Sequence, residues 1–140
     1  MSLRQKTAVL FIRLSKEYYK MKTSELTGSA LDWAVAKCEG LSVEDDGYIP
    51  PQGYIKTSKG RATIFYAPST DWAQGGAIIE REGFTIRPCF EGGWECYGRC
   101  GSREVWDTGA TLLKAAMRCY VASKLGDDVE LPIEFTEVTA

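Results

Sequence analysis

The pattern of hydrophobic and polar positions predicts three helices. The first follows the capping sequence Thr23-Ser24-Glu25 and stops at Gly40, where a left-handed C-terminal cap is expected. The second covers residues 72 to about 82, and the third covers residues 110–125. Hydrophobic side chains recur at helical spacing in the first and third segments. The second is predicted from the capping cluster Ser69-Thr70-Asp71 before it and from Gly83 as its stop.

Short runs of β-branched and aromatic residues predict strands between the helices. The expected strands are residues 54–56, 62–66, 84–90, 94–97 and a short one at Val105-Trp106. Glu91-Gly92-Gly93 joins two of these strands as a hairpin, and Pro88 makes the first of the pair an edge or bulged strand. Residues 42–60 are polar and read as a long loop. This order of elements predicts one α+β domain, in which a small, mainly antiparallel sheet is packed with helices.

Composition and charge exclude several classes of function. The chain has 140 residues, of which 44% are hydrophobic and 26% charged, and this excludes a disordered or collagen-like chain. Histidine is absent from the sequence, which excludes catalytic schemes and zinc sites that depend on imidazole. The longest uncharged hydrophobic run, Thr7 to Ile12, is far below the roughly 18 residues that a membrane span needs. Residues 21–140 carry a net charge of −6 without a basic stripe, which disfavours nucleic-acid binding by the main body.

The first twenty residues differ from the rest, because they carry a net charge of +4. They contain neither the long apolar region nor the small-residue cleavage site of a signal peptide. Lys16-Glu17 can be encoded by AAGGAG, a bacterial ribosome-binding sequence, and Met21 follows at the spacing of an initiator codon. Residues 1–20 are therefore expected to be a translated leader, and residues 21–140 the domain. A genuine N-terminal arm is the alternative.

Three blocks of the sequence resemble a phage family. Residues 22–40 (KTSELTGSALDWAVAKCEG), 68–83 (PSTDWAQGGAIIEREG) and 115–132 (AAMRCYVASKLGDDVELP) are similar to the NinX-like proteins of tailed phages and prophages. The resemblance implies a phage α-β-α sandwich domain in the cytoplasm of an infected or lysogenic bacterium. The family pattern commonly begins at the methionine matching Met21, which agrees with a leader before it. The resemblance transfers no catalytic residues.

Five cysteines raise the question of a metal site. Cys89, Cys96 and Cys100 surround the predicted hairpin, but structural zinc needs four ligands and usually a closely spaced cysteine pair. Cys38 and Cys119 fall among apolar residues of predicted helices, where small core side chains are expected. We expect free thiols, no metal and no cofactor.

The stretch from Ser69 to Gly76 is the strongest candidate for a site. Backbone N–H groups at a helix start can hold an anion, Gly75 and Gly76 permit close approach, and Trp72 can stack on a ring. The structural interpretation is that Asp71 caps the helix and that the glycines let another element pack closely. The candidate binding residues are Ser69, Thr70, Asp71, Trp72, Gly75, Gly76 and Trp94. We expect Asp71 to be a cap and Trp72 to be at least partly buried.

Two classes of function follow from these observations. The first is a non-enzymatic phage accessory protein that binds a host or phage protein. The second is a small-ligand binder or enzyme that uses residues 69–76. The acidic pairs Asp45-Asp46 and Asp127-Asp128 are expected to be solvated loop charges. Formation of a homo-oligomer stays open at this point.

Overall fold

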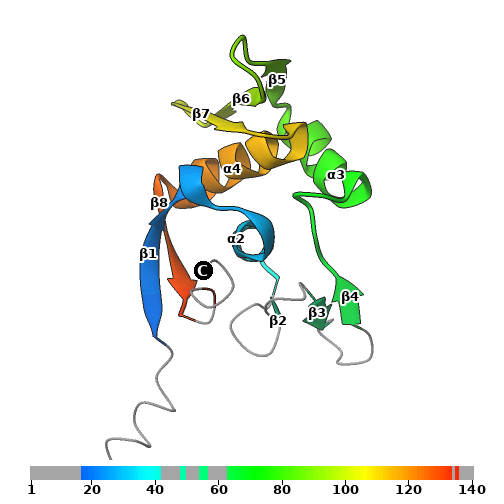
Figure 1. The fold of residues 1–140 in the computed structure, drawn as a ribbon, viewed down its shortest axis with the longest axis vertical. Helices are drawn as coiled ribbons and strands as arrows, with labels where there is room; N and C mark the ends of the chain where they lie inside the picture. The colour runs from blue at the N-terminus through cyan, green and yellow to red at the C-terminus, as the bar shows by residue number, and fades with distance from the viewer. Residues whose placement is uncertain (1–16, 42–47, 50–53, 57–62, 134, 136–140) are drawn as a thin grey trace, which may run out of the picture.

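The computed structural model describes residues 17–41, 48–49, 54–56, 63–133 and 135 (Figure 1). The helices in this part of the chain are the 3-10 turn η1 (Thr23–Glu25), α2 (Gly28–Cys38), α3 (Trp72–Glu82) and α4 (Leu112–Leu125). The strands are β1 (Tyr18–Lys22), β2 (Tyr48–Ile49), β3 (Tyr54–Lys56), β4 (Thr63–Phe65), β5 (Thr85–Pro88), β6 (Trp94–Cys100), β7 (Arg103–Gly109) and β8 (Asp128–Pro132).

The strands pair into small antiparallel sheets, β1-β8, β2-β3-β4 and β5-β6-β7. Together with the helices they confirm the α+β class. None of the described helices is long and apolar enough to cross a bilayer.

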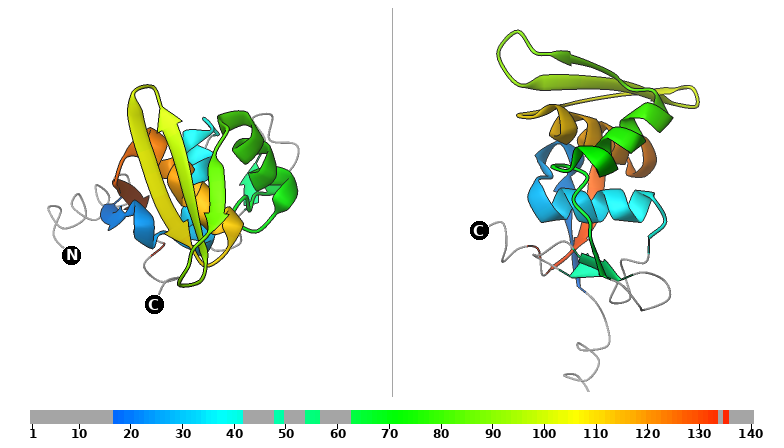
Figure 2. Two further views of the ribbon diagram at one scale, coloured as in Figure 1. Left: turned by 90° about the horizontal axis from the view of Figure 1, so that it is seen from above. Right: turned by 90° about the vertical axis from the view of Figure 1, so that its right-hand side faces the viewer.

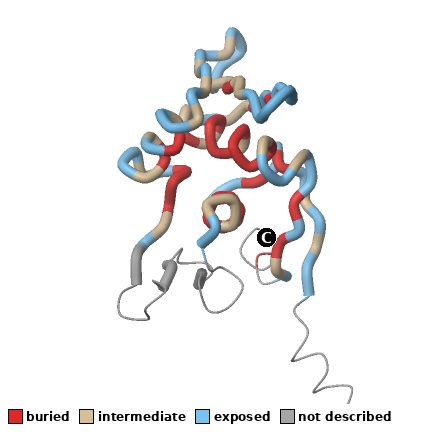
Figure 3. Tube along the Cα trace, turned by 180° about the vertical axis from the view of Figure 1, so that it is seen from behind, coloured by how far each residue is buried: buried red, intermediate tan, exposed pale blue. Residues whose placement is uncertain are grey.

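Helix α4 forms the centre of the molecule. It lies under β6 and β7 on one side and against α2 on the other, as the right-hand view of Figure 2 shows. Met117 and Tyr120 of α4 are buried together with Trp33 of α2 and Phe135, and α4 is buried over most of its length (Figure 3). Removing these large apolar side chains from water is the main favourable term in folding.

Helices cover only one face of the β5-β6-β7 sheet in the described part of the chain. Cys96, Val105 and Asp107 point to the covered face and are buried, whereas Arg87 and Trp106 point away and are exposed. Alternate residues of a strand face opposite sides, so this burial pattern follows directly from the register. Within the α+β class, the layers over this part of the molecule are therefore sheet, helix and helix.

Most predicted elements are present, with shifted ends. Helices α3 and α4 match their expected ranges, and β3 and β4 fall within the predicted strands. The first helix begins later than expected, because Thr23–Glu25 forms a 3-10 turn and α2 starts at Gly28. Strands β6 and β7 are longer than predicted, since their exposed positions are charged or polar and interrupt the hydrophobic signal. The predicted loop at 42–60 lies largely outside the described residues and includes β2.

Strands β1 and β8 were missed by the sequence pattern. Tyr18 pairs with Pro132 and Lys22 with Asp128, so β1 crosses the predicted boundary at Met21. Tyr19 and Met21 of β1 pack on the core, and Val129 and Leu131 of β8 are buried in it. Residues 1–16 of the predicted leader lie outside the described residues.

Candidate functional site

The predicted region from Ser69 to Gly76 forms the start of helix α3. The Asp71 carboxylate accepts a hydrogen bond of 2.9 Å from the Ala73 backbone N–H, which confirms Asp71 as the N-cap. Gly83 ends the helix in a left-handed conformation with φ of 69°. The capping signals in the sequence therefore located both ends of this helix.

The two glycines in α3 have different surroundings. A Cβ atom on Gly75 would lie 2.2 Å from the Pro68 carbonyl oxygen and 2.8 Å from Leu113 Cδ2. Gly75 is thus required for the close packing of α3 against this carbonyl and against α4. A Cβ atom on Gly76 would meet only Trp72 Cε3, at 3.7 Å, so Gly76 is not needed for packing.

Trp72 is 59% exposed, so the expectation of partial burial is wrong. The indole belongs to the first residue of α3, whereas the buried positions of this helix are Gly75 and Ile78. Trp72 instead lines a pocket of about 280 Å³ where the starts of α3 and α4 come together. The lining residues are Ser69, Thr70, Trp72, Thr111, Leu112, Leu113 and Lys114. Trp94 is not among these described lining residues; it packs on the core from β6.

Asp32 is a buried carboxyl group that the sequence analysis did not single out. It lies on α2 and accepts a hydrogen bond of 2.8 Å from the Ser69 backbone N–H, which fixes the loop before α3. Burial raises the pKa of Asp32 to about 6, although this hydrogen bond partly opposes the increase. An acidic residue within the hydrophobic run Ala30–Ala36 was the available signal.

The second candidate is the uncovered face of the β5-β6-β7 sheet, which we call the outer sheet face. Its side chains come from alternate positions of three neighbouring strands. It comprises Thr85, Arg87, Glu95, Tyr97, Arg99, Glu104, Trp106 and Thr108. The left-hand view of Figure 2 looks onto this sheet, with α4 behind it.

A connected group of polar and aromatic side chains occupies the centre of the outer sheet face. The Arg87 guanidinium contacts the Glu95 carboxylate, donates to the Tyr97 hydroxyl at 2.9 Å and lies 5.0 Å from the Tyr97 ring centroid. The Trp106 indole N–H donates to Glu95 at 3.3 Å, and the Tyr97 and Trp106 ring centroids are 6.5 Å apart. Trp106 is nevertheless 53% exposed. The Arg87 hydrogen bond lowers the pKa of Glu95, so this carboxylate is charged at neutral pH.

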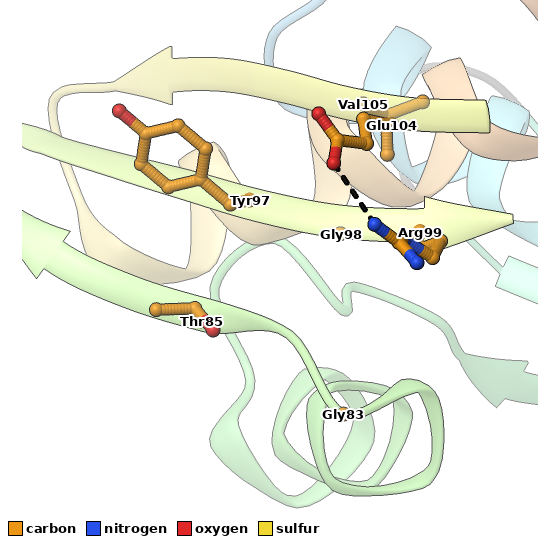
Figure 4. Close-up of a pocket in the computed structure, with 7 residues that line it drawn as sticks. All are labelled: Gly83, Thr85, Tyr97, Gly98, Arg99, Glu104 and Val105. Carbon is orange, nitrogen blue, oxygen red and sulfur yellow. Dashed lines mark hydrogen bonds and ion pairs between the residues drawn. The ribbon is translucent and has the colours of Figure 1, made fainter. Parts of the chain in front are cut away.

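A shallow pocket of about 290 Å³ lies at one end of this face, between Thr85 and the Arg99–Glu104 ion pair. Arg99 and Glu104 approach to 3.0 Å across the neighbouring strands, and Tyr97 bounds the pocket toward the centre of the sheet (Figure 4). A Cβ atom on Gly98 would lie 2.5 Å from the Phe84 ring, so glycine is needed for Phe84 to cover the strand there.

The cysteines near the hairpin do not converge. Cys96 is buried on the covered face of β6, and Cys100 is exposed four residues further along the same strand, about 13 Å away. In the described ranges, no three Cys, Asp or Glu side chains lie close enough to hold a metal ion together. Cys119 is buried as expected, and Cys38 is half-buried, where burial raises its pKa to about 12. Cys96 and Cys119 are therefore small side chains of the core.

A comparison with protein families identifies the family of the chain. The family model described as "Bacteriophage P22, NinX" matches residues 22–124, which span α2, α3, α4 and the β5-β6-β7 sheet. No curated protein matches the chain. The matched range covers most of the 140 residues and contains most of the resemblance blocks quoted above. The chain therefore belongs to the bacteriophage P22 NinX family.

Proposed function

We propose that this phage protein acts without catalysis, by binding a host or phage protein in the bacterial cytoplasm through the outer sheet face. The observation that carries the proposal is the half-exposed Trp106 on a sheet face that no described helix covers. A tryptophan that served only the core would be buried like Trp33, which is 1% exposed.

The residue types on this face support protein binding. Trp, Tyr and Arg are the side chains that most often dominate the energy of protein interfaces. Arg87, Tyr97 and Trp106 hold one another in place through Glu95. A group that is already ordered loses less conformational entropy when a partner binds, so more of its contact energy contributes to affinity.

The charges on this face are balanced, which favours binding through close contacts and disfavours a highly charged partner such as nucleic acid. Arg87 contacts Glu95, and Arg99 pairs with Glu104, so both signs are balanced across the sheet. Neutralising a nucleic-acid backbone requires uncompensated cations. Glu95 is also unsuited to general acid catalysis at neutral pH, because its pKa is lowered.

Affinity capture with matched variants tests the proposal. The full chain is used as bait in a lysate of phage-infected bacteria, beside Tyr97→Ala, Trp106→Ala and the control Trp72→Ala, which removes an exposed tryptophan from α3. Captured proteins are identified by mass spectrometry, and each is then purified and titrated against the four baits. We expect at least one protein to bind directly and to lose affinity more than tenfold with Tyr97→Ala and Trp106→Ala only. Direct partners that bind all four baits equally would contradict the proposal.

The pocket between the starts of α3 and α4 supports a second candidate, a small-ligand site. The specific observation is that Trp72 is exposed beside Lys114, and this pair suits a ring that carries an acidic group. Indole fluorescence can be titrated with anionic aromatic metabolites, using Trp72→Ala and Asp71→Asn as variants. Asp71→Asn keeps the helix cap. A small-ligand site predicts saturable binding that Trp72→Ala abolishes; a response that survives Trp72→Ala would exclude this pocket.

A further inference from the structure

Strand β7 forms one edge of the β5-β6-β7 sheet. It runs over seven residues, Arg103–Gly109, and pairs with β6 on one side. The opposite edge, β5, has only four residues and contains Pro88, which cannot donate a hydrogen bond. Strand β7 is therefore the edge better suited to accept another strand.

The Thr108 carbonyl shows which backbone groups of β7 point away from β6. This carbonyl accepts a hydrogen bond of 2.9 Å from Arg118 Nη1, so it points away from β6. Backbone direction alternates along an antiparallel strand, and Glu104 and Trp106 therefore face the same open edge as Thr108. The Thr108 N–H is bound to Asp107 Oδ1 at 2.8 Å, which leaves Glu104 and Trp106 as the open positions within the described β7.

We propose that two copies of this chain associate by antiparallel pairing of their β7 strands, with the twofold axis at Val105. In this register Glu104 of each copy lies opposite Trp106 of the other, so the open N–H and C=O groups of both residues are paired. A shift that centres the axis on Trp106 would place Glu104 opposite Thr108, whose backbone groups are already bonded. A shift toward Glu104 would use residue 102 of the turn.

The same register is complementary in charge on the covered face. It places Arg103 of each copy opposite Asp107 of the other, at the close spacing of a non-hydrogen-bonded pair. Asp107 is buried and forms no direct ion pair among the described residues. Arg118 is close enough to attract its charge, but donates hydrogen bonds to the Leu26 and Thr108 carbonyls instead. Arg103 forms an ion pair with the highly exposed Asp127, at 3.7 Å. Pairing between copies thus gives Asp107 a second cation, in addition to the nearby Arg118 of the same copy.

This association does not depend on the proposed partner site, but it would join two outer sheet faces into one surface. Residues on this surface let the two ideas be tested separately. Tyr97 lies on the central strand and takes no part in the edge, whereas the backbone of Glu104 does.

Sedimentation equilibrium of the full chain over a wide concentration range tests the proposal, with Glu104→Pro and Glu104→Ala as a matched pair. Proline removes the N–H that faces the second copy but no hydrogen bond to β6, whereas alanine keeps the N–H. We expect a monomer–dimer equilibrium that Glu104→Pro weakens at least tenfold and Glu104→Ala changes much less. Arg103→Glu should also weaken it, since it places two carboxylates opposite each other. Tyr97→Ala should leave it intact.

Hydrogen exchange supplies a second measurement that does not require variants. The amides of Glu104 and Trp106 should be protected at high protein concentration and should exchange rapidly when the protein is diluted. A monomer at millimolar concentration, or a dimer in which these amides exchange freely, would overturn the proposal. Loss of partner capture by Glu104→Pro without any change in self-association would overturn it as well and would assign the edge to the partner.

Discussion

The two neighbouring glycines of α3 should respond to alanine in opposite directions. Alanine in a helix interior is favoured over glycine by about 1 kcal/mol, so propensity alone predicts that both substitutions stabilise the protein. At Gly76 the new methyl group meets only the Trp72 ring at 3.7 Å, which is ordinary contact. Gly76→Ala should therefore raise the free energy of unfolding by about 0.5–1 kcal/mol.

Gly75→Ala should be destabilising, because its methyl group would lie 2.2 Å from the Pro68 carbonyl oxygen. This oxygen belongs to the backbone and cannot rotate away, and Leu113 Cδ2 blocks a second direction at 2.8 Å. Overpacking typically costs about 1–3 kcal/mol, and a clash with a fixed backbone atom belongs in the upper half of this range, about 2–3 kcal/mol, which outweighs the gain in helix propensity of about 1 kcal/mol. We expect a net loss of about 1–2 kcal/mol, or a decrease in Tm of roughly 3–8 °C for a domain of this size.

Urea unfolding followed by tryptophan fluorescence, with thermal unfolding as a check, measures both variants under the same conditions. Each serves as the control for the other, since the substitution, the helix and the neighbouring position are the same. The reasoning fails if Gly75→Ala is as stable as the natural chain, or if Gly76→Ala is the more harmful of the two. Equal destabilisation by both would show that α3 tolerates no change at its start for reasons other than the Pro68 carbonyl.

Two further predictions concern pH and the N-terminal strand. The pKa of Asp32 is raised from an ordinary value of 3.8 to about 6 in the folded protein. Between these two pH values the folded protein keeps a proton that the unfolded chain releases. The free energy of unfolding should therefore decrease as pH rises from about 4 to about 6. The decrease is on the order of 3 kcal/mol. Urea unfolding across this pH range should show a smaller decrease for Asp32→Asn. An unchanged slope would refute the raised pKa of Asp32 as its cause. Deletion of residues 1–16 should leave Tm within a few degrees of the full chain. Deletion of residues 1–20 also removes Tyr18 to Lys20 from β1 and should lower Tm further. Thermal unfolding measures both truncated chains, and equal Tm values would show that a leader extending to residue 20 is dispensable.

The sequence predicted those elements whose local chemistry points in one direction. Helix α3 carries Asp71 and Gly83 as terminal signals, and α4 repeats hydrophobic residues along one stripe, so local pattern and packing agree. Strand β8 was missed because its hydrophobic signal is limited to Val129 and Leu131 between acidic residues; its Pro132 is tolerated because β8 is an edge strand of a two-stranded sheet. Strand β1 was missed because it obtains its stability from β8, which is more than one hundred residues away in the chain.

The candidate sites were harder to predict, because exposure depends on which face of an element is covered. Trp72 follows a correctly predicted cap, but the cap does not specify that α4 packs on the side of Gly75 and leaves the indole outside. The importance of Asp32 likewise depends on a loop 37 positions away. Such relations between distant segments are absent from a local pattern of polar and apolar residues.

The outer sheet face admits a purely structural explanation that the variants must separate from binding. Cross-strand contacts such as Tyr97 with Trp106 stabilise antiparallel sheets by about 0.2–1 kcal/mol each, so Trp106 contributes to folding even if it binds nothing. That contribution is small beside the 3–5 kcal/mol expected for truncating a buried tryptophan such as Trp33. Trp106→Thr keeps a residue that strands favour and removes the ring. A small loss of stability with a large loss of partner affinity would therefore assign the ring to recognition, whereas parallel losses would assign it to the sheet.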